Sequence, residues 1–162
     1  MRDFQDSKKE IEEILHNNNL GLLCMIDGSI PYSLPITYGY HDGRIIFHCN
    51  LKGRKIDILR KNNNVSFVVA SQFGDFVPHP QGAKCHAHSK SVICVGKARI
   101  VEDLEERTAL LNIFNRCLVQ DAREILPDEA KGCYAVEILI SEMTARIERD
   151  SQCTFYRYRF IR

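Results

Sequence analysis

Two stretches of the chain place apolar residues at helical spacing. Near the N-terminus, Ile11 and Ile14 fall on one helical face, and Ser7 with Glu10 three positions later forms a capping box. The same combination of a capping box and an apolar stripe recurs in the segment DLEERTALLNIFNRCLVQ at 103–120. The pattern therefore predicts one helix at each place.

Elsewhere the pattern changes to short apolar or alternating runs, which are typical of strands. Three such runs, at 20–26, 30–40 and 44–49, are separated by Asp-Gly, a strong hairpin signal. A short amphipathic helix is predicted at 52–63. Further strand-like runs follow at 65–71, 91–101 and 133–140. Six strands in hairpin order predict a mainly β (α+β) fold, a small antiparallel barrel with flanking helices, because a parallel sheet would need a helix after each strand.

The segment before the predicted strand 91–101 contains glycines and prolines and has no period. We interpret residues 72–89 as a long, mobile loop that gates a substrate site, because Phe73 and Phe76 could cover a planar ring. The same segment carries four potential ligands for zinc or a haem iron, but their spacing matches no familiar metal site, and we predict no metal. These four residues are His79, Cys85, His86 and His88.

Composition narrows the classes of function. With 162 residues and 44% hydrophobic content the chain fits one globular domain, and a net charge of +1 disfavours a non-specific nucleic-acid binder. No apolar run resembles a signal peptide or approaches the length of a membrane span. The seven cysteines include no CxxC pair and fit reduced thiols. We therefore expect a cytoplasmic protein with neither a nucleic-acid nor a membrane partner.

The C-terminal residues 151–162 alternate aromatic and basic side chains, and we interpret them as a tail beyond a main domain at 1–150. Such alternation suits a nucleic acid or a membrane surface. A short strand that adds to a neighbouring strand explains it equally well. The pattern leaves both interpretations open.

A cluster of cations follows the predicted strand 44–49. Lys52, Arg54 and Lys55 surround Gly53 where a buried strand gives way to a helix. Cations at a helix start are unfavourable unless an anion is bound, and we expect no acidic neighbour to satisfy them. A guanidinium, an ammonium group and the first amides of a helix together suit a phosphate dianion. The cluster predicts a phosphate site, and the alternative is the solvated first turn of a surface helix.

Residues 31–69, PYSLPITYGYHDGRIIFHCNLKGRKIDILRKNNNVSFVV, together with SVICVGKARIV at 91–101, resemble a known family. This is the flavin-binding split β-barrel family that includes pyridoxamine 5′-phosphate oxidase, and the chain is more closely similar to its nitroimidazole-reductase branch. The resemblance implies a six-stranded antiparallel split β-barrel with Greek-key order in residues 1–150. It also implies bound FMN and a homodimer with the flavin at the subunit interface. By position, the phosphate would contact Arg54 and Lys55, and the whole set of FMN-binding residues would be Ile36, Thr37, Tyr38, His48, Cys49, Lys52, Gly53, Arg54, Lys55, Ser91 and Val92.

The resemblance further implies an oxidoreductase that passes electrons from reduced FMN to a nitroaromatic, a quinone or a similar small planar acceptor. The sequence offers no Ser-His-Asp or paired-carboxylate arrangement as a competing active site, and we assign no catalytic residue. Two other classes stay open, a haem-binding or haem-handling split-barrel protein and a flavin-binding module without catalysis. Relatives carry an aromatic residue just before Ser91 and Val92, where this chain has His88, Ser89 and Lys90. The substrate and the electron donor are therefore left open.

Overall fold

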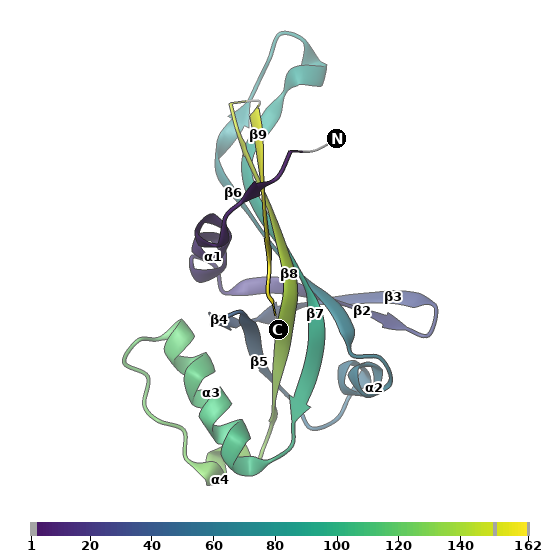
Figure 1. Cartoon of the computed structure of the whole chain (residues 1–162), viewed down its shortest axis with the longest axis vertical. Helices are drawn as coiled ribbons and strands as arrows, with labels where there is room; N and C mark the ends of the chain where they lie inside the picture. Colours follow the sequence, from purple (N-terminus) through teal and green to yellow (C-terminus); the bar gives the residue numbers. More distant parts are fainter. Residues whose placement is uncertain (1–2, 151, 162) are drawn as a thin grey trace.

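The computed structural model describes residues 3–150 and 152–161, which form one nine-stranded sheet with helices packed on it (Figure 1). The order is β1-β9-β8-β7-β6-β2-β3, and β5 pairs with both β4 and β8. Neighbouring strands are antiparallel except β1 and β9. The strands are β1 (Gln5–Asp6), β2 (Leu20–Asp27), β3 (Ile30–Thr37), β4 (Gly39–His41), β5 (Arg44–Cys49), β6 (Asn64–Val77), β7 (His86–Val101), β8 (Tyr134–Arg149) and β9 (Gln152–Arg159).

The three predicted helices are confirmed. They are α1 (Lys8–His16), α2 (Arg54–Lys61) and α3 (Leu104–Leu118). The Asp103 carboxylate accepts a hydrogen bond from the backbone N–H of Glu106 at 2.8 Å, so the predicted N-cap of α3 is present. Two short helical turns, η1 (Gly82–Lys84) and α4 (Pro127–Ala130), were not predicted.

The sheet bends into an incompletely closed barrel because β8 changes its partner along its length. Residues 134–139 of β8 pair with β5, whereas the part from Glu142 onward pairs with β9. β7 follows β8 on the other side, with a register shift between Val95 and Gly96. Only glycine fits at the shift, since a Cβ on Gly96 would collide with the carbonyl group of Leu139. The mainly β split-barrel fold with flanking helices is thus confirmed, with nine strands rather than six.

Two apolar clusters stabilise the fold. The larger one fills the barrel and includes Tyr38, Phe47 and Phe67 together with the apolar face of α1. The Tyr38 hydroxyl donates a hydrogen bond to the Leu15 carbonyl oxygen at 2.8 Å, and burial raises the pKa of this phenol. The smaller cluster packs α3 against Ile46 and the start of β8. Burying a large aliphatic or aromatic side chain stabilises the fold by about 1.5–3 kcal/mol, so the clusters hold the helices in place.

The predicted long loop at 72–89 is wrong, because β6 and β7 continue through most of it. Gln72 pairs with Ser89 and Val77 pairs with His86, so only residues 78–85 connect the two strands. The register of the β6–β7 ladder shifts between Gln72 and Phe76, which indicates a bulge, and Gly74 within it has φ of +73°. The glycines and prolines therefore mark a bulge and a turn within one long hairpin.

The C-terminal residues form a strand that adds to a neighbouring strand, as one of the two interpretations of the tail predicted. β9 pairs with β8 along its length, and β1 adds to the outer edge of β9. Ser151 and Arg162 of the predicted tail lie outside the described residues. In the part of the chain that the structure describes, no helix is long and apolar enough to cross a membrane.

Candidate functional site

Arg54, the first residue of α2, is held by two groups from the β2–β3 hairpin. Its Nε donates a hydrogen bond to the Asp27 carboxylate at 2.9 Å, and its guanidinium lies 4.3 Å from the centroid of the Tyr32 ring. The expectation of a cation without an acidic neighbour is therefore wrong for Arg54. The side chain is still 53% exposed. The hydrogen bond to Asp27 uses Nε, so the Nη groups of this half-exposed side chain can donate to an anion.

The backbone at the start of α2 is shaped for a sharp entry into the helix. Gly53 has φ of +129°, a conformation that side-chain-bearing residues rarely adopt, and its carbonyl oxygen accepts from Ile56 N and Asp57 N. As at every helix start, the first amides of α2 have no acceptor within the helix. They therefore lie beside Arg54 as additional donors for an anion.

Lys55 is the second residue of α2, directly after Arg54. Its ammonium group is 5.5 Å from the centroid of the Phe47 ring. Burial raises the pKa of the Cys49 thiol, and the charge of Lys55 acts in the opposite direction. Lys52 precedes the helix and is exposed. Arg54 and Lys55 thus both lie at the start of α2, whereas Cys49 at the end of β5 is buried in the core cluster.

The remaining predicted flavin contacts divide between the two faces of the sheet. Thr37 and Ser91 lie on the outer face, where side chains point away from the barrel core. Ile36, Tyr38 and Val92 are buried in the core cluster, so they could reach an external ligand only through backbone atoms.

His48 lies away from the other predicted flavin contacts. Its ring packs against Phe114 of α3, with the two ring centroids 5.4 Å apart. The neighbouring residues Phe47 and Cys49 belong to the core cluster on the opposite side of β5. This follows from strand geometry, in which successive side chains point to opposite faces. Although His48 precedes Cys49 in the sequence, the two side chains lie on opposite faces of β5.

The outer face formed by β2, β6 and β7 is apolar and uncovered. Leu22 and Ile26 of β2 and Ile93 and Val95 of β7 are 45–50% exposed. Residues that alternate with them, such as Cys94, are fully buried. We call Leu22, Ile26, Val68, Ile93 and Val95 the outer apolar face. Large exposed apolar patches are uncommon on monomeric proteins and mark interaction sites.

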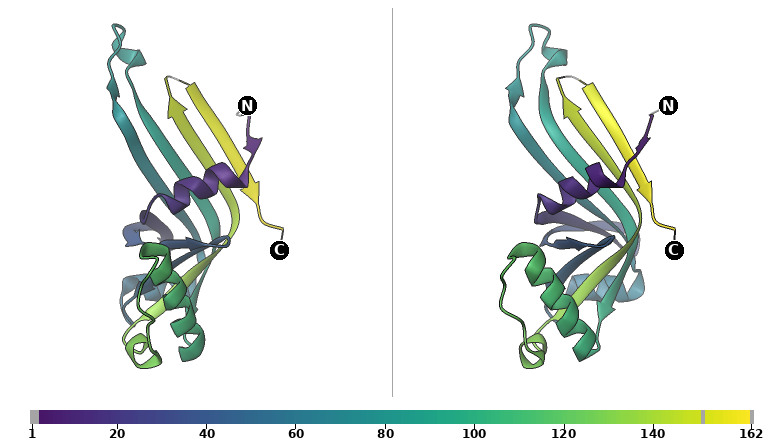
Figure 2. Two further views of the ribbon diagram at one scale, coloured as in Figure 1. Left: turned by 90° about the vertical axis from the view of Figure 1, so that its left-hand side faces the viewer. Right: turned by 60° about the vertical axis from the view of Figure 1, so that its left-hand side comes forward.

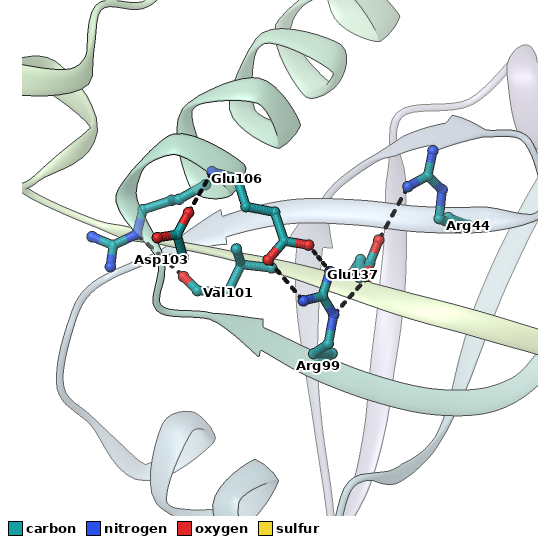
Figure 3. A network of polar contacts seen from close by, with 7 residues as sticks. Arg44, Arg99, Val101, Asp103, Glu106 and Glu137 are labelled. Carbon is teal, nitrogen blue, oxygen red and sulfur yellow. Dashed lines mark hydrogen bonds and ion pairs between the residues drawn. The ribbon is translucent and has the colours of Figure 1, made fainter.

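The buried carboxylate of Glu137 belongs to a structural network instead of an active site (Figure 3). It accepts hydrogen bonds from Arg99 Nε at 2.8 Å and from Arg44 at 3.3 Å. Arg99 also pairs with Glu106 of α3 and thereby lowers the pKa of that carboxyl group. The network joins β5, β7, β8 and α3, and it leaves Glu137 fully engaged by cations. The sequence contained no signal for it, since its members are far apart in the chain.

The four potential metal ligands of the β6–β7 hairpin do not converge. Cys85 Sγ accepts from the backbone N–H of His79 at 3.3 Å, while the His88 ring faces Asp150, with 3.2 Å between Nε2 and Oδ1. Among the described residues, no group of three or more His, Cys, Asp or Glu side chains could hold a metal ion. These four residues are close together in the sequence, but the folded hairpin does not bring them around one point.

The sheet topology and the flanking helices place the chain in the class of mainly β split-barrel proteins. Residues 7–147 match the model of the pyridoxamine 5′-phosphate oxidase family, and the chain belongs to this family. The predicted resemblance to the family and to its nitroimidazole-reductase branch is confirmed. A comparison with curated proteins found no match.

Several solved structures share the fold of this chain. A protein from Bacteroides thetaiotaomicron described as a candidate 5-nitroimidazole antibiotic resistance protein is similar, with 25% identity over 88% of this chain and 85% of that one, and a TM-score of 0.77. A flavocytochrome from Azotobacter vinelandii shares the fold at 16% identity, over 97% of this chain and 80% of its own, with a TM-score of 0.78. An FAD-binding protein from Mesorhizobium loti shares the fold at 22% identity, over 88% and 96%, with a TM-score of 0.65.

Proposed function

We propose that this chain is an FMN-binding oxidoreductase that acts as a homodimer and reduces a nitroaromatic, a quinone or a similar planar acceptor. The observation that carries the proposal is the arrangement at the start of α2. Arg54 is oriented there by Asp27 and Tyr32, and Lys55 lies beside it. Free thiols at all seven cysteines support action in a reducing compartment, the cytoplasm.

The donor set at the start of α2 fits the phosphate of FMN. The free Nη edge of Arg54 supplies a fork of N–H donors, Lys55 supplies a point charge, and the first amides of the helix add a favourable dipole. Asp27 offsets part of the positive charge of Arg54, and Lys55 adds a second cation for the dianion. Hydride or electron transfer would be supplied by the bound flavin, and the chain would provide orientation and shielding from water.

The outer apolar face supports the homodimer. A planar flavin ring needs cover on both faces, and one shallow sheet surface covers only one of them. A second copy of the chain, related by a two-fold axis, would bury the outer apolar faces against each other and enclose the ring beside Thr37 and Ser91. In this arrangement the polar hydroxyls of Thr37 and Ser91 would contact the edge of the ring.

The visible spectrum of the purified protein, followed by titration with FMN and riboflavin, tests the proposal. A flavin spectrum, or saturable uptake of one FMN per chain with weaker uptake of riboflavin, is the expected result. An intense Soret band would instead favour the haem-binding class. Flavin uptake without consumption of a nitroaromatic or quinone under reducing conditions would favour a non-catalytic flavin module. A colourless protein that takes up no FMN would overturn the proposal.

A further inference from the structure

The long strands carry the sheet well beyond α1. α1 crosses one face of the sheet, and the β6–β7 hairpin and the β8–β9 hairpin rise past it (Figure 2). The side chains on that face include Phe73, Lys90, Ile147 and Arg149, since Lys90 is paired with Ile147 and both Lys90 and Arg149 approach the Phe73 ring. Ile147 packs on the edge of the core cluster that contains the apolar face of α1, which fixes the face to which these residues point. We call this surface the arm face.

Two cations of the arm face converge on one aromatic ring. Lys90 Nζ, from β7, lies 5.3 Å from the centroid of the Phe73 ring, and the guanidinium carbon of Arg149, from β8, lies 5.4 Å from it. His88 stacks at a tilt against the same ring, with centroids 5.5 Å apart. A cation is attracted to the face of an aromatic ring, but two like charges near one ring repel each other.

The arm face has fewer carboxylates than cations. Asp150 lies beside Lys90 and Arg149, but its Oδ1 is 3.2 Å from Nε2 of the His88 ring, so this one acid is shared with a third group. Within residues 3–150 and 152–161, neither Lys90 nor Arg149 has a carboxylate partner. Most of the arginines elsewhere in the sheet are paired with acids, as Arg146 is with Glu148 and Arg159 with Glu142. A ligand anion would supply the missing charge.

A depression of about 520 Å³ lies beside the two cations. Its apolar and aromatic lining comes from Ile147 and Tyr156, and its polar lining residues are Lys90, Arg149, Asp150, Gln152 and Thr154, so two cations face one carboxylate. The size is within the range of small-molecule sites, about 300–1,000 Å³. A planar ring could lie on Ile147 and Tyr156 while an anionic group reaches the cations.

The donors on the arm face favour a carboxylate over a phosphate. The backbone amides of β8 and β9 point along the sheet, toward neighbouring strands, so they do not point out of its face into the depression. The site therefore offers one guanidinium and one ammonium group but no nest of amides or helix start of the kind that phosphate sites use. Two cations match the two oxygens of one carboxylate.

We propose that the arm face binds a small aromatic carboxylate, whose carboxylate bridges Lys90 and Arg149 and whose ring lies on Ile147 and Tyr156. The site is separate from the start of α2. It does not depend on flavin binding, so its test stands independently of the proposed function.

The probe for the test is 2-naphthoate, titrated by calorimetry into the unmodified full-length protein, with neutral 2-naphthalenemethanol as the uncharged comparison. We expect one saturable site per chain for 2-naphthoate and at least roughly tenfold weaker binding of the alcohol, because the alcohol lacks the charge-assisted contacts. Lys90→Met and Arg149→Met keep the apolar stems, and each should weaken 2-naphthoate about fivefold to tenfold. Lys97→Met, an exposed lysine of the same strand, is the matched control and should have no effect.

A nuclear Overhauser contact between the 2-naphthoate ring and Tyr156 in the unmodified protein provides a second measurement that does not rely on variants. Circular dichroism verifies that each variant is folded. Equal binding of acid and alcohol, unchanged affinity in the Lys90→Met/Arg149→Met double variant, or the absence of any saturable site or contact would each overturn the proposal.

Discussion

Arg54 at the start of α2 and Asp27 at the end of β2 form an ion pair in which Nε donates to Oδ2 at 2.9 Å. The pair fixes one edge of the guanidinium, and the Tyr32 ring supports its face. Asp27 therefore has two opposing effects on a bound phosphate. It orients the cation that would bind the phosphate, and its own negative charge repels the same group.

Substituting Asp27→Asn separates these effects, because the amide oxygen of asparagine can still accept from Arg54 Nε while the charge is gone. We expect FMN to bind roughly threefold to tenfold more tightly, since one exposed charge at short range is worth about 1 kcal/mol. Riboflavin affinity should be unchanged. Fluorescence quenching of the flavin measures both affinities, and Glu105→Gln on the exposed surface of α3 is the control. Weaker FMN binding would mean that the charge of Asp27 is needed to position Arg54.

Removing the cations themselves tests the phosphate site directly. Arg54→Met and Lys55→Met should each weaken FMN by about 1.5–3 kcal/mol, the scale of a hydrogen bond to a charged group. Riboflavin lacks the phosphate, so its affinity should stay nearly constant. Titration of each variant with both flavins gives the comparison. An equal loss for both ligands would show that the two cations support the fold or the ring instead of a phosphate.

The close packing at Gly96 leads to a prediction about the free energy of unfolding. A Cβ at this position would lie 2.9 Å from the carbonyl carbon of Leu139 and closer still to its oxygen, so β7 and β8 would have to separate. We expect Gly96→Ala to lower the free energy of unfolding by about 2–3 kcal/mol, a typical cost of overpacking. Gly132→Ala is the matched control, because a Cβ there meets nothing within 4 Å. Urea denaturation of both variants checks the difference, and equal stabilities would contradict the close packing at Gly96.

The sequence allowed the helices and most of the strands to be predicted because these depend on local periodicity. The apolar face of α1 and the cap at Asp103 are examples, and both are present. The Arg54–Asp27 pair was not predictable in the same way. The pair forms because the β2–β3 hairpin packs against α2, and the residues near Arg54 in the sequence give no sign of this contact. The Arg99–Glu137 pair was missed for the same reason.

The β6–β7 hairpin shows the opposite failure, in which local signals were present but misleading. Glycine and proline between 72 and 89 favoured a loop, whereas the cross-strand pairs of a long ladder hold most of the segment as strand. Hydrogen exchange distinguishes the two descriptions. Paired amides of residues 86–89 should exchange on average more slowly than those of residues 78–85, which connect the strands. Uniformly fast exchange of the amides from 72 to 89 would instead support the predicted mobile loop.

The outer apolar face leads to a prediction about assembly. If two copies bury this face, a carboxylate at Val95 would be placed in the interface without a partner, which costs several kcal/mol per chain. We expect the unmodified protein to scatter light at twice the chain mass of 18.6 kDa and Val95→Glu to scatter at the single-chain mass. Because Val95 is 47% exposed in the single chain, the variant should remain folded.

Val119→Glu is the matched control for this experiment, since Val119 is also an exposed valine, 59% accessible, but lies at the end of α3 away from β2, β6 and β7. It should stay dimeric. FMN should shift the unmodified protein further toward the dimer on dilution, because a ligand that contacts both copies binds the assembled state preferentially. Val95→Glu should correspondingly bind FMN more weakly than Val119→Glu does. A Val95→Glu protein that remains dimeric would place the interface elsewhere, and an unmodified monomer that holds FMN tightly would show that one chain is enough to cover the flavin.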